Sequence, residues 1–311
     1  MPISLRAALR WASGLTLAVA TLASAGPRTA ASAGLLFDDF SYADLAELTA
    51  GGWTPRSKAG HPGVPGALWS AEQFSLVADP LQPGNRLLRM TAQTDGTGPG
   101  TRQAQLCHAR KYLEGTYAAR VRFNDKPLRG LDGDPVIQTF YVVSPLKHDF
   151  DPNFSELDFE YLPNGGWGSD KTRLYGITWQ TVQLDPWQAY NQSHEEMVSL
   201  DGWHVLMMQI ADGKTRLYLD GRLLAQHGGR NYPVVPMSIN FNLWFSPGGL
   251  LEKSEEARVY QEDVDWVFHA RKQVLSPKQV MAEVKRLRAG GVKHIDTVPP
   301  ANPALPSLCD F

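Results

Sequence analysis

Three acidic residues lie two positions apart in the stretch FSELDFEYL, residues 154–162. They are Glu156, Asp158 and Glu160, and the positions between and after them are apolar: Leu157, Phe159 and Tyr161. A period of two predicts a half-buried strand, because successive side chains of a strand face opposite ways. The apolar residues then face a core and the acids share the other face. This pattern fits either a solvated strand face or a set of catalytic carboxylates.

Glycoside hydrolysis commonly uses two carboxyl groups that flank the bond to be cleaved. One carboxylate stays ionised and attacks as the nucleophile, while the other is held protonated and acts as general acid and then as base. Glu156 and Glu160 are four residues apart, which is about 13 Å along an ideal strand. Long glutamate side chains on a curved sheet can lean toward each other. Asp158 lies between them, where its charge can push their pKa values apart.

A second stretch, residues 237–245, separates its residues just as cleanly into two faces. One face is apolar: Met237, Ile239, Phe241, Leu243 and Phe245. The other face consists of Ser238, Asn240, Asn242 and Trp244. Amides that hydrogen-bond hydroxyl groups beside a flat aromatic ring suit a sugar. We therefore expect Asn240, Asn242 and Trp244 to bind carbohydrate. The alternative for Trp244 is packing beneath a loop.

Two segments carry further aromatic residues that could lie beside a sugar. YLPNGGWGSDK contains Trp167, and TWQTVQLDPWQAYNQ contains Trp179 and Trp187. We expect Trp167 and Trp179 to bind substrate, with simple packing as the alternative. Such loops, rather than the acids, would decide which linkage the site accepts.

Strands and turns dominate residues 35–270. GTYAARVRF, PVIQTFYVVSP and PMSINFNLWF each predict a strand, and the Asp-Gly pairs at 212–213 and 220–221 predict tight hairpins. One helix is expected in SPKQVMAEVKRLRAGG, where Ser276 can cap the start and two glycines end it. Serial antiparallel strands with little helix predict an all-β sandwich of two antiparallel sheets. A short C-terminal helix and a proline-rich tail follow in residues 271–311.

The N-terminal segment has the features of a secretory signal peptide over residues 1–33. Arg6 and Arg10 precede a short apolar run, and small residues allow cleavage after Ala25 or Ala33. The run is shorter than the roughly 20 residues that span a bilayer. We therefore expect a secreted, extracellular protein with no membrane association after cleavage.

Charge and cysteine content restrict the partners and the compartment. A formal net charge of −2 over 311 residues gives no argument for binding nucleic acid or anionic membranes. Two cysteines in an exported chain favour a disulfide between Cys107 and Cys309, with two free thiols as the alternative. We expect a monomer whose partner is a polysaccharide.

The stretch ELDFE resembles the Glu-x-Asp-x-Glu signature of glycoside hydrolase family 16. GTYAARVRF, DGWHVLMMQI, TRLYLDGRLL, PMSINFNLWF and VDWVFH are similar to successive strands of that family, in the same order, over residues 35–270. The resemblance implies a concanavalin-like β-jelly roll and cleavage of β-linked polysaccharides with retention. It also implies Glu156 as nucleophile, Asp158 as assisting acid and Glu160 as acid/base.

Other features of the resemblance concern the surroundings of this motif. Its spacing resembles the unbulged branch of the family, which includes mixed-linkage glucanases and xyloglucan-active enzymes. The family often has Gly directly before the first Glu of the motif and Trp a few residues further upstream. In this sequence Ser155 and Phe154 stand there instead. Family members often bind a structural calcium ion through an Asp near the last strand, which implies Asp265 as a ligand. The chemistry itself requires no cofactor.

The sequence therefore predicts a retaining endo-glycosidase that hydrolyses internal β-linkages of a polysaccharide. A β-glucan is the favoured substrate. A transglycosylase on the same site and a non-catalytic polysaccharide-binding sandwich are the alternatives. The acidic triplet argues against binding alone, since binding needs no paired glutamates. A polysaccharide lyase usually needs a Tyr or His base with a residue that neutralises a uronate, and the sequence shows no clear set of this kind.

Overall fold

The structure is a computed structural model that describes Met1, residues 34–306 and Cys309. The chain divides after Ala30 into two units, and every described residue except Met1 lies in the second. The expected signal peptide, residues 1–33, thus lies outside the described residues apart from Met1. In the described part of the chain, no helix combines the length and the apolar character needed to cross a membrane.

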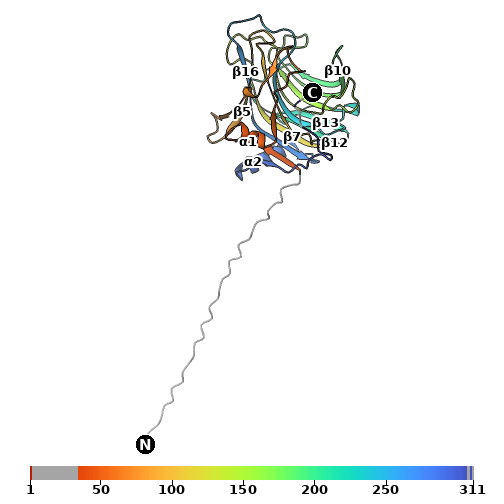
Figure 1. The fold of residues 1–311 in the computed structure, drawn as a ribbon. Coiled ribbons are helices and arrows are strands. Elements are labelled where there is room, and N and C mark those ends of the chain that lie inside the picture. The colour runs from red at the N-terminus through yellow and green to blue at the C-terminus, as the bar shows by residue number, and fades with distance from the viewer. Residues whose placement is uncertain (2–33, 307–308, 310–311) are drawn as a thin grey trace. The chain divides into compact units, whose positions relative to one another are not determined.

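Two sheets packed face to face form the second unit, and Figure 1 shows their curved strands. In spatial order the first sheet consists of β17 (His294–Asp296), β1 (Leu35–Asp38), β16 (Arg258–Arg271), β7 (Gly115–Phe123), β12 (Gly202–Ala211), β13 (Lys214–Leu219) and β14 (Arg222–Gly228). The first half of β16 also pairs with β5 (Arg86–Thr94), which pairs with β4 (Phe74–Ala78).

The second sheet carries the predicted acidic strand near its middle. Its spatial order is β2 (Trp53–Pro55), β6 (Arg102–His108), β15 (Ser238–Phe245), β8 (Val136–Val143), β9 (Glu156–Leu162), β10 (Arg173–Gln183) and β11 (Gln188–Glu196). β3 (Leu68–Trp69) pairs in parallel with β6, and the other pairings named here are antiparallel. The predicted antiparallel two-sheet sandwich is confirmed.

The strand faces follow the alternation in the sequence. Leu157, Phe159 and Tyr161 of β9 are fully buried in the core between the sheets. The predicted apolar face of residues 237–245 lies in the same core. Alternation therefore assigned the inner faces correctly, and it leaves the acids of β9 on the outer face of the second sheet.

Local turn chemistry also forms as expected. Asp212 and Asp220 have positive φ angles of 54° and 50°, and each is followed by a glycine, as the Asp-Gly hairpin turns require. These turns join β12 to β13 and β13 to β14.

The predicted C-terminal helix is α2 (Pro277–Ala289). Ser276 and Gln279 form a capping box at its start. Its buried side chains are Val280, Val284 and Leu287, which pack against apolar residues on the outer face of the first sheet.

Short helical segments complete the fold. α1 (Leu45–Ala50) was not expected from the sequence, because its six residues are too few for a helical period. Asp44 caps it by accepting hydrogen bonds from two backbone N–H groups. Two single turns of 3₁₀ helix occur at Ala71–Gln73 and Gly229–Asn231.

Candidate active site

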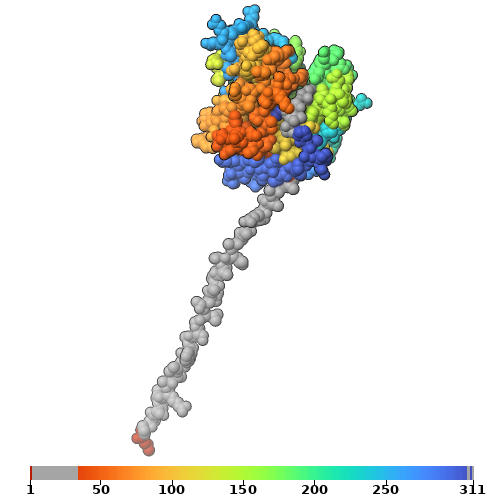
Figure 2. Space-filling model, in the orientation of Figure 1, coloured from red at the N-terminus to blue at the C-terminus, as the bar shows by residue number. Residues whose placement is uncertain are grey.

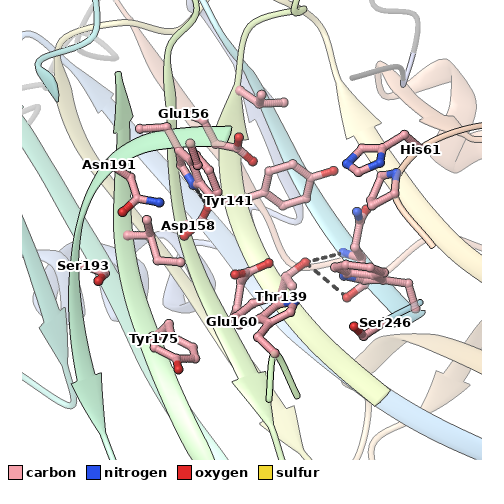
Figure 3. A pocket seen from close by; sticks show the side chains of 18 of the residues that line it. His61, Thr139, Tyr141, Glu156, Asp158, Glu160, Tyr175, Asn191, Ser193 and Ser246 are labelled. Carbon is pink, nitrogen blue, oxygen red and sulfur yellow. Dashed lines mark hydrogen bonds between the residues drawn. The ribbon is translucent and has the colours of Figure 1, made fainter. Parts of the chain in front are cut away.

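The three acids lie on β9, an inner strand of the second sheet between β8 and β10. Glu156 lies between Val143 of β8 and Trp179 of β10, and Asp158 lies between Tyr141 of β8 and Ile177 of β10. Glu160 lies between Thr139 of β8 and Tyr175 of β10. Alternate positions put all three on the outer face. Figure 3 shows Glu156 and Glu160 with Asp158 between them. The structure thus brings the three expected catalytic residues together.

A cleft of about 720 Å³ covers this face of the second sheet. Its floor comes from six neighbouring strands, β6, β15, β8, β9, β10 and β11. The polar and acidic lining residues on these strands are Gln105, Asn242, Thr139, Tyr141, Glu156, Asp158, Glu160, Tyr175, Asn191 and Ser193. The acids therefore lie inside the cleft, with lining strands on both sides of them.

Hydrogen bonds leave part of the acidic cluster available to a ligand. The indole Nε1 of Trp179 donates to Oδ2 of Asp158 at 2.7 Å. Oδ1 of Asp158 and Oε2 of Glu160 are buried, and neither has a hydrogen-bond partner among the described residues. Buried polar atoms usually have partners, so two orphaned carboxyl oxygens in a cleft point to a ligand that supplies hydroxyl groups.

Burial dominates the acid–base properties of the cluster. Glu156 is 7% exposed and Asp158 3% exposed. Desolvation, with the negative charge of Asp158 adding to it, raises the pKa of both Glu156 and Glu160 well above the usual range. Desolvation raises the pKa of Asp158 to about 7, although the hydrogen bond from Trp179 opposes this. The cluster therefore retains protons at a pH where exposed carboxyl groups have lost them.

This arrangement can perform acid–base chemistry on a neutral ligand. A protonated buried carboxyl group can donate a proton, and an ionised neighbour can attack or stabilise positive charge. Both roles are available on one face of β9, because three neighbouring acids with raised pKa values can be partly protonated and partly ionised at the same pH. Burial of the acids also lowers the dielectric around them, which strengthens the electrostatic interactions among them.

Four of the five residues expected to bind sugar line the cleft: Trp244, Asn242, Trp179 and Trp167. Trp244 is 6% exposed, because part of its ring packs with Trp69 and neighbouring apolar residues. Trp167 is exposed, and its ring centre lies 5.2 Å from that of Tyr175. Trp179 has a role that the sequence did not indicate, since it holds the carboxyl group of Asp158.

Asn240 differs from expectation because it does not line the cleft. It is 1% exposed, and its side chain exchanges hydrogen bonds with Ser238. In the register it lies opposite Cys107, which forms a disulfide with Cys309. The predicted disulfide is thus confirmed. It brings the C-terminal segment to the end of β6 beside Asn240.

Asp265 also takes a different place from the one expected. Its carboxyl oxygens accept hydrogen bonds from Arg120 at 2.7 Å, from Arg288 at 2.7 Å and from Asn85 at 2.8 Å. Two guanidinium groups thus compensate its charge. Among the described residues, no group of three or more His, Cys, Asp or Glu side chains is arranged to hold a metal ion. Asp265 does not fit a calcium ligand, and it anchors α2 to the first sheet instead.

Several lining residues were not identified from the sequence. Tyr141 accepts a hydrogen bond from Gln105 at 2.8 Å across the floor of the cleft. Both faces of β8 are largely apolar, so its cleft face could not be distinguished by alternation. His61 reaches the cleft from a loop that has no periodic pattern. For these missed lining residues, the sequence offered one signal, the alternation of the polar residues Asn191 and Ser193 on β11.

Comparison with known proteins gives different results for sequence and for structure. No protein-family model matches the sequence, and no curated protein matches it. Solved structures do match. The β-glucanase of Bacillus licheniformis is 16% identical with a TM-score of 0.54, and the alignment covers 77% of this chain and 99% of that chain.

A glycoside hydrolase family 16 endo-glucanase from Bacteroides ovatus, solved in complex with G4G3G-2F-DNP, is 14% identical with a TM-score of 0.56. The alignment covers 75% of this chain and 99% of that chain. LamAcat from Zobellia galactanivorans is 12% identical with a TM-score of 0.50, over 77% and 98% of the two chains. At these identities the similarity establishes the fold. The chain has the curved jelly-roll sandwich of these structures, as the resemblance predicted.

Proposed function

We propose that this chain is a retaining endo-glycosidase that cleaves internal β-linkages of a neutral polysaccharide, in first place a β-glucan. The observation that carries the proposal is the position of the three acids, Glu156, Asp158 and Glu160, inside a cleft on one strand. Two of their oxygens have no partner among the described residues, and burial raises the pKa of each acid. A solvated strand face would leave the acids exposed and ionised.

The roles follow from double-displacement chemistry. The Glu156 carboxylate attacks the anomeric carbon and forms a glycosyl ester, while Glu160 gives its proton to the leaving oxygen. Glu160 then takes a proton from the water that attacks the anomeric carbon and releases Glu156. Asp158 lies between the two and is held by Trp179, so its charge influences the proton that the glutamates exchange.

Internal cleavage is supported by the extent of the cleft. Lining residues continue from β9 toward β11 on one side and toward β6 on the other. Five steps between neighbouring strands at about 4.8 Å give a floor on the order of 24 Å. A glycan chain can therefore extend on both sides of the acids, which suits cleavage within a polymer.

A neutral substrate is supported by the charges around the acids. Apart from the three acids, the described lining residues carry no charged side chain at neutral pH. His61 is the one basic residue type among them, and desolvation, with the positive charge of Arg56 adding to it, lowers its pKa. A uronate or sulfated polymer would meet negative charge without a compensating cation. Two structures with this fold were solved with glucan oligosaccharides, which agrees with a neutral chain.

The test combines substrate screening with role-specific variants. The protein should release reducing ends from lichenan or laminarin, but not from carrageenan, and the first product should have the β configuration by proton NMR. Glu156→Ala should abolish turnover, and azide should restore it as an α-glycosyl azide. Glu160→Ala should stop cleavage of polymers but still react with an activated aryl β-glycoside. Full activity of Glu156→Ala, or an initially α product, would exclude this mechanism. Product sizes above those of the substrate would indicate transfer instead of hydrolysis.

A further inference from the structure

Two aromatic side chains meet above the cleft from segments far apart in the sequence. The ring centres of His61 and Trp187 lie 6.1 Å apart, with the ring planes inclined by 28°. His61 belongs to the loop between β2 and β3, and Trp187 to the turn between β10 and β11. Both residues line the cleft.

The strand order shows that this contact crosses the cleft. β2 lies at one edge of the second sheet, beside β6, and β10 and β11 lie at the other edge. β15, β8 and the acidic strand β9 lie between them. Figure 2 shows the orange N-terminal segments and the green residues around β10 on two sides of the surface. A stack between segments attached to these two sides therefore bridges the cleft like an arch.

The loop side of the arch is firmly braced. Arg56 is 4% exposed and donates to the carbonyl oxygens of Lys58 at 2.9 Å and of His61 at 3.1 Å. A third bond from its guanidinium group goes to Oε1 of Gln105 at 2.8 Å, on the cleft floor. The loop is thus tied to β6, and His61 is held in position by a buried cation.

The hairpin side is attached to the cleft through the Trp187 ring. This ring contacts Trp179 edge to face, with centres 6.1 Å apart, in addition to its stack on His61. Trp187 remains 56% exposed, so more than half of its surface is open to solvent. An exposed tryptophan that bridges two walls above a line of acids has its free ring surface available to a ligand.

We infer that His61 and Trp187 act as a specificity arch that admits an unbranched glycan chain and rejects chains with side branches at the sugars beside the acids. This inference rests on the proposed function for the identity of the ligand as a polysaccharide. A linear chain can lie on the floor beneath the two rings, whereas a branch that points away from the floor meets them. A polymer cut at internal bonds enters only when the hairpin separates from His61, and the arch then closes over it.

Lichenan, a linear β-glucan, and xyloglucan, whose β-glucan backbone carries side chains, are the probes. Affinity electrophoresis in gels containing each polymer would compare four proteins, all with Glu156→Gln to prevent cleavage: the unmodified arch, Trp187→Ala, His61→Ala and the control Tyr190→Ala. Tyr190 is an exposed aromatic residue on the same hairpin that does not line the cleft.

The intact arch and the control should prefer lichenan. Each arch variant should lower this preference about tenfold through tighter binding of xyloglucan, which corresponds to about 1.4 kcal/mol. Melting temperatures should stay unchanged, because neither substituted side chain belongs to the buried core. An unchanged preference in both variants, or failure of every protein to bind either polymer, would overturn the inference. Binding of lichenan without any product from the protein with Glu156 intact would overturn the proposed hydrolysis alone.

Discussion

Replacement of Asp158 by asparagine should stabilise the protein while it slows the reaction. The substitution keeps an acceptor oxygen for the Nε1 of Trp179, which lies 2.7 Å from the carboxyl group. It removes a group that is 3% exposed and costly to ionise. In the proposed mechanism Asp158 does not take part in bond making, so activity should fall less than in Glu156→Ala or Glu160→Ala.

The size of the stability gain follows from the pKa of this carboxyl group. Desolvation raises the pKa of Asp158 from 3.8 to about 7. Between these values the unfolded chain has released the proton and the folded chain retains it, so stability falls as pH rises. Each pKa unit corresponds to about 1.4 kcal/mol, so a shift of about three units costs about 4 kcal/mol above pH 7. Asp158→Asn does not carry this cost, because asparagine does not ionise. The free energy of unfolding of Asp158→Asn should exceed that of the parent protein least near pH 4 and by a few kcal/mol at pH 8.

Urea unfolding at pH 4, 6 and 8, without reductant, would measure this advantage. The control is Asp212→Asn at an exposed turn, where asparagine also accepts the positive φ of 54°. The free energy of unfolding of Asp212→Asn should differ from that of the parent protein by the same amount at all three pH values. If Asp158→Asn is equally or less stable than the parent protein at pH 8, desolvation does not dominate this site, and the protonation argument for the cluster is wrong.

Four further outcomes are expected. Trp244→Ala should lower kcat/KM on a soluble glucan at least about tenfold with a smaller effect on folding, and a loss seen only as a lower melting temperature would assign Trp244 to packing. Reduction of the Cys107–Cys309 bond, which spans a sequence separation of 202, should lower the free energy of unfolding by up to about 5 kcal/mol in the chain-entropy model, as read from urea unfolding with and without reductant. Glu262 is fully buried on β16 and burial raises its pKa, so Glu262→Gln should be more stable than the parent at pH 8 and similar at pH 4. If the proposed mechanism holds, the rate of glucan cleavage should fall on acidification at a pH above the ordinary glutamate pKa, because in that mechanism Glu156 must lose its proton to attack and its pKa is raised. A profile flat down to pH 4 would contradict this.

The parts of the fold that the sequence predicted are those that depend on neighbouring residues. Alternation placed Leu157 and Phe159 in the core and the acids on the other face, since a strand has a fixed period of two. The Asp-Gly turns and the Ser276 cap also require only adjacent backbone geometry. The disulfide needed one further argument, the export of a chain with two cysteines.

The parts that the sequence did not predict depend on contacts between distant segments. Asn240 has the same alternation as Asn242, yet the disulfide at the opposite position of β6 lies where a sugar was expected. Asp265 lies in the middle of β16, the last long strand, but Arg120 and Arg288 reach it from β7 and α2. His61 enters the cleft because a buried arginine holds its loop. None of these contacts has a period or spacing in the sequence.

Chemistry and stability act in opposite directions on the two faces of β9. On the cleft face, three desolvated acids cost stability, about 4 kcal/mol for Asp158 alone if it ionises only above pH 7. On the core face, Leu157, Phe159 and Tyr161 are fully buried. Burial of each large apolar side chain contributes about 1.5–3 kcal/mol, so the core face offsets the cost of Asp158. Hydrogen bonding to β8 and β10 on both sides fixes the strand between these faces. An edge strand would lack one of these neighbours and could tilt its acids toward water. The position of β9 within the sheet thus contributes to the desolvation that raises the pKa values of its carboxyl groups.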